Sequence, residues 1–246
     1  MIRACNEVNE KTLIRLLKFG CDEKIKEFVL QHAPSINMNY LDFNLKTPLS
    51  AAIDREDPEI LCFLLANIST DLNDTAVQPS GRTVIMYASF KCNNPQMLEE
   101  LLKKNANPRQ TDICGWNSLQ YAIAGEKIAN VSYLLKYGLS KNFRDFKGQT
   151  PLMTAVLLSS LDIIKLLLNC KVDIDERDDV GLSAIQIAIL YRKRDAILLL
   201  IQKGANMAQV TPLTNASLKQ LSNTTMPKQL PYIQIEKKYS NKSFNI

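Results

Sequence analysis

The residues that could do chemistry are few, and their spacing assembles no known catalytic motif. His32 is the only histidine, so a general base or metal site built on it would have no second imidazole. A Cys-His nucleophile would need Cys5 or Cys21 to reach His32 together with a third, orienting group. The sequence contains neither the glycine-rich phosphate loop with its lysine nor the serine elbow between glycines. We therefore predict a non-catalytic protein with no cofactor, no metal site and no small-molecule substrate.

The cysteines and the acidic residues also lack the spacing of a metal site. The six cysteines are far apart and none belongs to a CxxC pair: Cys5, Cys21, Cys62, Cys92, Cys114 and Cys170. This spacing favours free, mostly buried thiols over zinc ligands. The acidic run from Asp173 to Asp179 resembles a calcium loop only superficially, because the required glycine and the twelfth-position glutamate are missing. We expect a solvated hairpin there.

The net charge of +5 comes mainly from the end of the chain. Residues 211–246 contain five lysines and one glutamate, a net charge of +4, which leaves +1 for the first 210 residues. A folded surface that binds phosphates usually concentrates Lys and Arg on one face. Nucleic acid is therefore disfavoured as a partner.

The composition favours a soluble, core-forming and helical chain. Hydrophobic residues make up 46% and charged residues 22% of the 246 positions, with only 7% aromatic residues. Purely apolar runs such as Ala196–Ile201 are far shorter than the roughly 20 residues that span a bilayer. The N-terminus has no apolar signal-peptide core. We expect no membrane span and a cytoplasmic location, with the nucleus as the alternative.

A motif of eight residues recurs five times along the chain. Its sixth residue falls at positions 47, 83, 117, 150 and 183, so the spacings are 36, 34, 33 and 33 residues. An apolar pair follows each of these positions after 17 or 18 residues: Leu64-Leu65, Leu101-Leu102, Leu134-Leu135, Leu167-Leu168 and Leu200-Ile201. Two markers in phase indicate a repeat protein whose neighbouring units share one elongated core.

Each unit is predicted to be a pair of short helices and a turn. Thr47-Pro48 and Thr150-Pro151 place a hydroxyl N-cap directly before a proline, whose missing N–H costs nothing at the first helical position. Apolar residues follow at helical spacing, then a break, then a second apolar helix. The predicted architecture is therefore all-α.

The repeated motif resembles a known family. Asp145-Phe-Lys-Gly-Gln-Thr-Pro-Leu with Ala155 after it, and Leu134-Leu135-Lys-Tyr-Gly138 one unit earlier, is similar to the ankyrin repeat pattern D-x-x-G-x-T-P-L-H-x-A with a later L-L-x-x-G-A. The resemblance covers about Asp42 to Met207. It implies an ankyrin-repeat solenoid of stacked helix-turn-helix units with hairpin loops, acting in protein–protein interaction.

Two positions depart from the family pattern. The histidine after Pro-Leu is replaced by Ser50, Met86, Gln120, Met153 and Gln186. The glycine between the helices is replaced by Glu56, Glu126, Ser159 and Arg192. We expect these departures to affect stability more than fold.

Five ankyrin-type repeats are expected over residues 42–210, with atypical ends. Residues 1–41 are similar to a degenerate capping repeat, with amphipathic stretches from Lys11 to Phe19 and from Glu23 to His32. Residues 211–221 are predicted to form a C-terminal cap, because terminal units of solenoids are commonly atypical. Residues 222–246 are polar and lack a helical period, which predicts a flexible basic tail.

The resemblance also implies a binding surface, the concave face formed by the loop tips and the first helices. The contact positions carried over to this chain are Phe43, Lys46, Arg82, Phe90, Ile113, Trp116, Phe146, Lys147, Gln149, Leu182 and Tyr191. This row is unusually apolar, and aromatic residues flanked by Arg or Lys are typical of interface hot spots, so Trp116 is the first predicted contact. The alternative is that Trp116, Phe146 and Phe43 pack between neighbouring hairpins or under the tail.

A second partner is implied by the C-terminal residues. Ser217-Leu-Lys-Gln-Leu-Ser222-Asn-Thr-Thr-Met226 resembles the start of the SOCS box, which in ankyrin-repeat proteins recruits elongin to a cullin ubiquitin ligase. Leu230-Pro231 is similar to the start of its cullin-contacting part. The segment between them is shorter than that box needs, and Asn223-Thr-Thr is a poor helix. A capping helix with a loose tail is the competing interpretation.

The sequence thus predicts a non-catalytic interaction module, a scaffold or adaptor that binds an unidentified partner protein through its concave face. The alternative is a substrate-recognition adaptor of a cullin ubiquitin ligase. The second alternative is a nuclear regulator whose tail contacts nucleic acid.

Overall fold

The structure is a computed structural model that describes residues 2–42, 46–75, 80–158 and 160–206, with side chains from residue 9 onward. The chain divides into two units, Met1–Ala205 and Asn206–Ile246. Apart from Asn206, the second unit lies outside the described residues. The predicted cap at 211–221 and the predicted tail at 222–246 therefore remain predictions.

The described residues fold into helices and form no β-strand beyond an isolated bridge between Arg177 and Ser183. The helices are α1 (Ile2–Phe19), α2 (Asp22–His32), the short 3-10 helix η1 (Ala33–Ser35), α3 (Pro48–Asp54), α4 (Pro58–Asn67), α5 (Val84–Lys91), α6 (Gln96–Lys103), α7 (Ser118–Ala124), α8 (Ile128–Lys136), α9 (Pro151–Leu158), α10 (Leu161–Asn169), α11 (Ala184–Leu190) and α12 (Arg194–Gln202). The all-α prediction is confirmed. The first helix is longer than predicted, because it begins at Ile2 rather than near Lys11.

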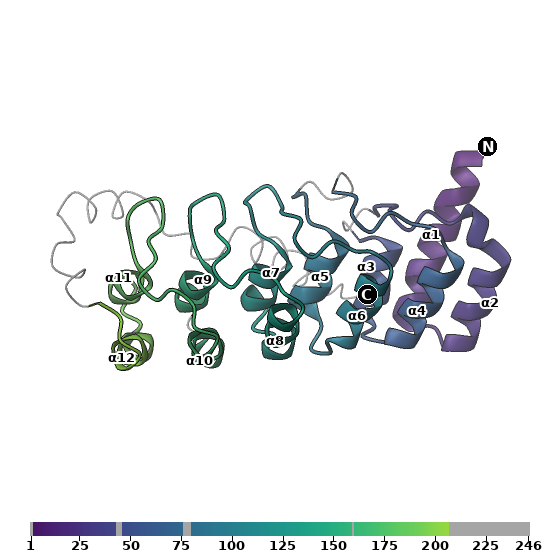
Figure 1. Cartoon of the computed structure of the whole chain (residues 1–246). Coiled ribbons are helices and arrows are strands. Elements are labelled where there is room, and N and C mark those ends of the chain that lie inside the picture. The colour runs from purple at the N-terminus through teal and green to yellow at the C-terminus, as the bar shows by residue number, and fades with distance from the viewer. Residues whose placement is uncertain (1, 43–45, 76–79, 159, 207–246) are drawn as a thin grey trace, which may run out of the picture. The chain divides into compact units, whose positions relative to one another are not determined.

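The helices of the first unit form two rows. The first helix of each pair contacts the first helix of the next, in the order α1, α3, α5, α7, α9 and α11. Second helices also contact one another, since α4 contacts α2 and α6, and α10 contacts α8 and α12. Figure 1 shows both rows, with the long loops that join successive pairs projecting to one side. Because each short pair buries its apolar stripe against its neighbours, the core runs through the unit from Leu13 to Leu200.

The helix starts explain how the missing histidines are tolerated. The Thr47 hydroxyl accepts a hydrogen bond from the Ser50 backbone N–H at 3.0 Å, and the Ser50 hydroxyl accepts one from the Thr47 N–H at 2.9 Å. In the third repeat, the Asn117 amide oxygen caps Gln120, and the Gln120 amide oxygen accepts from the Asn117 N–H at 3.2 Å. These reciprocal capping boxes satisfy two backbone donors at each helix start. The replacements at this position therefore keep a helix cap.

The replaced glycines between the helices do carry a conformational cost. Glu56, Glu126 and Arg192 have φ angles of 55°, 55° and 54°, and Lys171, which follows the second helix of its pair, has 56°. Ser159 lies outside the described residues. A side chain in this left-handed region brings Cβ too close to the following carbonyl oxygen, at a cost of roughly 1–2 kcal/mol per residue. The departures therefore lower stability locally while the stack keeps its geometry.

Replacing Glu126 and Lys171 with glycine is expected to raise the free energy of unfolding by about 0.5–1 kcal/mol at each site. Glycine removes the clash, although its larger freedom in the unfolded chain offsets part of the gain. The midpoint temperature of thermal unfolding should rise by about 2–4 °C for each kcal/mol of stability gained. Glu126→Ala and Lys171→Ala remove the same charges but keep Cβ. If the alanine variants gained as much stability, strain would not be the explanation.

Candidate protein-interaction site

The third, fourth and fifth hairpins are each closed by a buried aspartate. One Asp145 oxygen, Oδ1, accepts hydrogen bonds from the backbone N–H groups of Lys147 and Gln149, both at 2.9 Å. Asp112 and Asp178 make the same pair of bonds two and four residues further along their own hairpins. Such charge-assisted bonds fix the hairpin backbone at its base. The repeated aspartate of the sequence motif therefore shapes the loop that carries the candidate site.

Neighbouring hairpins are joined at their tips by backbone hydrogen bonds. The N–H of Ile113 donates to the Ser80 carbonyl at 3.2 Å, and the N–H of Phe146 donates to the Cys114 carbonyl at 3.3 Å. The N–H of Asp179 continues the ladder to the Lys147 carbonyl at 3.0 Å. The tips therefore form one continuous edge rather than independent loops.

Three large apolar side chains stand out from this edge. Ile113 is 66% exposed, Phe146 is 70% exposed and Val180 is 55% exposed. Each comes from a different hairpin, and the backbone ladder joins these hairpins in a row. We call Ile113, Phe146 and Val180 the hairpin edge. A row of exposed apolar groups on a fixed backbone is typical of a contact surface.

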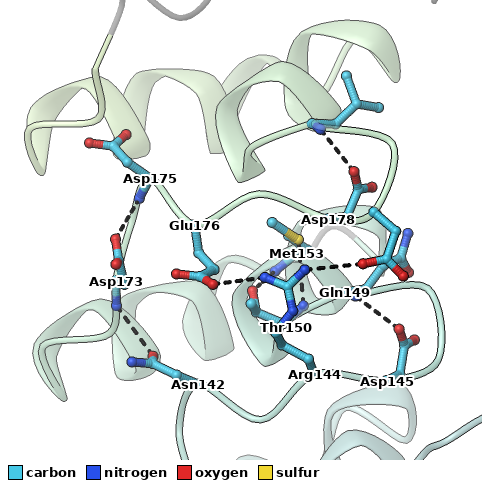
Figure 2. A network of polar contacts seen from close by, with 12 residues as sticks. Asn142, Arg144, Asp145, Gln149, Thr150, Met153, Asp173, Asp175, Glu176 and Asp178 are labelled. Atoms are coloured by element: carbon cyan, nitrogen blue, oxygen red, sulfur yellow. Dashed lines mark hydrogen bonds and ion pairs between the residues drawn. The ribbon is translucent and has the colours of Figure 1, made fainter.

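The acidic run of the sequence links the fourth and fifth hairpins. Arg144 Nη1 donates to Glu176 Oε1 at 2.7 Å, and its Nη2 donates to Asp179 Oδ1 at 3.2 Å. These carboxylates raise the pKa of Arg144 above its usual value. In Figure 2, Arg144 lies between the hairpin based on Asp145 and the hairpin based on Asp178. Glu176 and Asp179 thus hold two hairpins in register.

The predicted contact residues fall into several groups in the structure. Exposed side chains are Ile113, Phe146 and Lys147. Half-buried side chains are Lys46, Arg82, Phe90, Gln149 and Tyr191. Trp116 and Leu182 are buried, with 7% and 6% of their surface exposed. Phe43 lies outside the described residues.

The prediction that Trp116 is an exposed contact is wrong. Its indole Nε1 donates to Asp145 Oδ2 of the next hairpin at 2.9 Å, and its ring meets Tyr121 edge-on at 5.8 Å. The Tyr121 hydroxyl in turn donates to Asp112 Oδ2 at 2.8 Å. Trp116 therefore packs between the third and fourth hairpins, whereas Phe146, for which the same packing was considered, is exposed. Leu182 is likewise part of the core beneath the fifth hairpin.

A charged cluster occupies the N-terminal part of the predicted face. Lys46 Nζ donates to Asp54 Oδ2 and to the Tyr87 hydroxyl, both at 2.6 Å, and Tyr87 also donates to Asp54. The Arg82 guanidinium lies 4.9 Å from the Tyr87 ring centroid, a cation–π distance. Tyr87 and Asp54 were missed from the sequence. Tyr87 lies four residues after its N-cap position, Thr83, and only the stacked neighbour shows what it meets.

The thiols differ from the sequence expectation. No disulfide joins the five cysteines whose side chains are described, but only Cys92 among them is buried, and Cys21 and Cys62 are exposed. Burial raises the pKa of Cys92 to about 12, so its thiol stays protonated at neutral pH. Mostly buried thiols were predicted, and that prediction is wrong for these residues.

In the part of the chain that the structure describes, no three His, Cys, Asp or Glu side chains are arranged to hold a metal ion. Among the same residues, no helix has the length and apolar character needed to cross a bilayer. The SOCS-box-like segment with Leu218 and the basic tail lie outside the described residues, so both alternatives built on them remain predictions.

Comparison with known proteins points to one family. A family model for ankyrin repeats (three copies) matches residues 85–178 and 140–211, which together extend over 127 of the 246 residues. The ankyrin repeat domain of Bcl-3 is a structural neighbour with a TM-score of 0.66 and 22% sequence identity, covering 79% of this chain and 86% of that one. This likeness shows the fold, and the predicted ankyrin-type architecture is confirmed.

Curated relatives are similar over part of their length. The putative ankyrin repeat protein FPV031 of fowlpox virus is 32% identical over 133 residues, which are 53% of this chain and 38% of that protein. Glycerophosphocholine phosphodiesterase GDE1 of Candida albicans is 30% identical over 142 residues, which are 55% of this chain and 12% of that protein. Human neurogenic locus notch homolog protein 1 is 29% identical over 121 residues, only 5% of its length. The chain thus spans well under half of each of these relatives.

Proposed function

Since the chain belongs to the ankyrin-repeat family, we propose that this protein–protein interaction module is a scaffold or adaptor whose hairpin edge and concave face bind a partner protein. The observation that carries the proposal is the hairpin edge, where Ile113, Phe146 and Val180 project from a hydrogen-bonded backbone. A group of large exposed apolar side chains on a protein surface commonly marks an interaction site.

The rigidity of the edge supports binding over mere exposure. The aspartate bases, the tip-to-tip hydrogen bonds and the Arg144 ion pairs hold the hairpins before a partner arrives. A preorganised surface loses little conformational freedom on binding, so more of the contact energy appears as affinity. Binding on this proposal is stoichiometric and involves no catalysis, and the proposed location is the cytoplasm.

The remaining accessible positions extend the proposed surface. Lys147 follows Phe146 at the tip, and Gln149 lies two residues further along the same hairpin. Further contacts are proposed for the half-buried Lys46, Arg82, Phe90 and Tyr191. Trp116 and Leu182 support the hairpins from beneath and are not proposed as contacts.

The double variant Ile113→Ser/Phe146→Ser is expected to lose the partner while the stack stays folded. Truncating two hot-spot side chains commonly costs 2 kcal/mol or more, so recovery of the partner should fall about 30-fold. The measurement is affinity purification from cell extract with quantitative mass spectrometry, comparing the double variant with the unaltered chain.

A matched control separates the hairpin edge from general surface apolarity. Leu30 and Ile128 are 66% and 45% exposed on helices α2 and α8, away from the hairpins. The variant Leu30→Ser/Ile128→Ser should retain the partner. The proposal would be overturned if the Ile113→Ser/Phe146→Ser variant recovered as much partner as the unaltered chain. The circular dichroism spectrum should show that the variant keeps its helices.

A further inference from the structure

The loop between α11 and α12 carries three consecutive cations. Arg192 and Arg194 are exposed and Lys193 is half-buried, and Asp195 is the only acidic residue beside them. Within the described part of the chain, none of the three cations forms a salt bridge or a side-chain hydrogen bond. We call Arg192, Lys193 and Arg194 the basic loop.

Equivalent loops elsewhere in the stack have a different charge. Glu56 and Asp57 occupy the first inter-helix loop, and Glu126 with Lys127 occupies the third. Glu56, Glu126 and Arg192 share the same left-handed backbone conformation, with φ angles of 55°, 55° and 54°. The inter-helix loops therefore share one backbone conformation but differ in the sign of their side-chain charge. Among these three loops, only the loop of the fifth repeat has an excess of basic residues.

An apolar surface adjoins the basic loop. Leu157 and Leu158 end α9, and Leu190 and Tyr191 occupy the corresponding positions 33 residues later. Because α9 contacts α11, these two pairs lie on neighbouring helices, which pack about 8–10 Å apart. All four side chains are half-buried, so part of their apolar surface stays accessible.

Tyr191 is one of the contact positions that the ankyrin pattern assigns to the concave face. Tyr191 directly precedes Arg192, the first residue of the basic loop. The apolar surface and the basic loop are thus adjacent parts of one face.

We propose that the fifth-repeat end of the concave face binds a partner segment in which acidic residues flank apolar ones. The apolar side chains contact Leu157, Leu190 and Tyr191, and the carboxylates pair with the basic loop. This inference rests on the proposed function and gives the partner a stated chemistry. Complementary charge fixes the register of a segment and speeds its association, while the apolar contacts supply affinity.

Charge also distinguishes an acidic partner segment from the protein's own C-terminal residues as the ligand of this surface. Residues 211–246 carry five lysines and one glutamate, so they do not supply the acidic residues that the proposed segment needs. A second copy of the chain offers carboxylates at Glu56 and Asp57, which makes self-association an outcome that the test must separate. An acidic, apolar segment of another protein satisfies both parts of the surface.

The test uses the full chain and two fluorescent peptides in which leucine and phenylalanine alternate with either glutamate or glutamine. The glutamate peptide should bind in anisotropy titrations, and the glutamine peptide should bind at least about fivefold more weakly. Arg192→Gln/Arg194→Gln should weaken the glutamate peptide about five- to tenfold, and raised salt should erase that difference. Lys171→Gln/Lys203→Gln removes the same charge from exposed positions that follow α10 and α12, and should bind like the unaltered chain.

Several outcomes would overturn the inference. Equal binding of both peptides, equal loss in the Lys171→Gln/Lys203→Gln control, or tighter competing binding of duplex DNA would each do so. A peptide-independent dimer that Arg192→Gln/Arg194→Gln dissolves would assign the basic loop to self-association instead. The proposed function fails separately, if Ile113→Ser/Phe146→Ser leaves partner recovery intact while the glutamate peptide still requires the basic loop.

Discussion

Replacing Asp145 with alanine is expected to lower the free energy of unfolding by about 3–5 kcal/mol. The carboxylate is only 7% exposed and accepts three hydrogen bonds, from two backbone N–H groups of its own hairpin and from the indole of Trp116 at 2.9 Å. Removing it leaves these donors without an acceptor. Hydrogen bonds to charged groups contribute about 1.5–3 kcal/mol each, so the loss is a large part of a typical domain's stability.

Trp116 reports this loss directly, because it is the only tryptophan in the chain. Urea unfolding followed by its fluorescence should show a lower midpoint for Asp145→Ala. Asp178→Ala is the graded control, since Asp178 accepts from the backbone of Val180 and Leu182 but has no indole donor. Its cost should be smaller. Equal midpoints for the unaltered chain and Asp145→Ala would show that the hairpins do not depend on their aspartate bases.

The repeat architecture could be predicted because its signals are local. A helix start is predicted from two adjacent residues in Thr47-Pro48 and in Thr150-Pro151. In the structure, α3 and α9 begin at these prolines. The spacing of the apolar pairs then requires neighbours that share a core. Nothing in these inferences depends on knowing which side chain of one repeat meets which side chain of the next.

The candidate site was predicted less well because the exposure of a side chain depends on its contacts with the neighbouring repeat. Trp116, Gln149 and Lys46 occupy the same position in three repeats, yet the first is buried and the other two are half-buried. The difference for Trp116 is the acceptor oxygen of Asp145, which belongs to the next hairpin. Sequence position identified the face, whereas the neighbouring hairpin decides which residues remain accessible on it.

Gly125→Ala is expected to destabilise the stack by about 3 kcal/mol, although alanine is the better helix former. The φ angle of Gly125 is −81°, which any residue adopts without strain. However, a Cβ at this position would overlap the Phe90 carbonyl oxygen and lie 2.8 Å from the carbonyl carbon, both backbone atoms of the preceding repeat. The backbone at the end of α5 would have to move away from α7, which would disturb the packing of the second repeat on the third.

Gly204→Ala distinguishes close packing from backbone strain. Gly204 has a φ angle of 89°, and an added Cβ there would meet no atom within 4 Å. Its replacement should cost only the roughly 1–2 kcal/mol of a left-handed alanine. Thermal unfolding should therefore rank Gly125→Ala below Gly204→Ala, the reverse of the order that backbone angles alone would give. The opposite ranking would mean that the second and third repeats can move apart at little cost in free energy. Close packing between the backbones at Phe90 and Gly125 would then contribute less to the stability of the stack than their contact indicates.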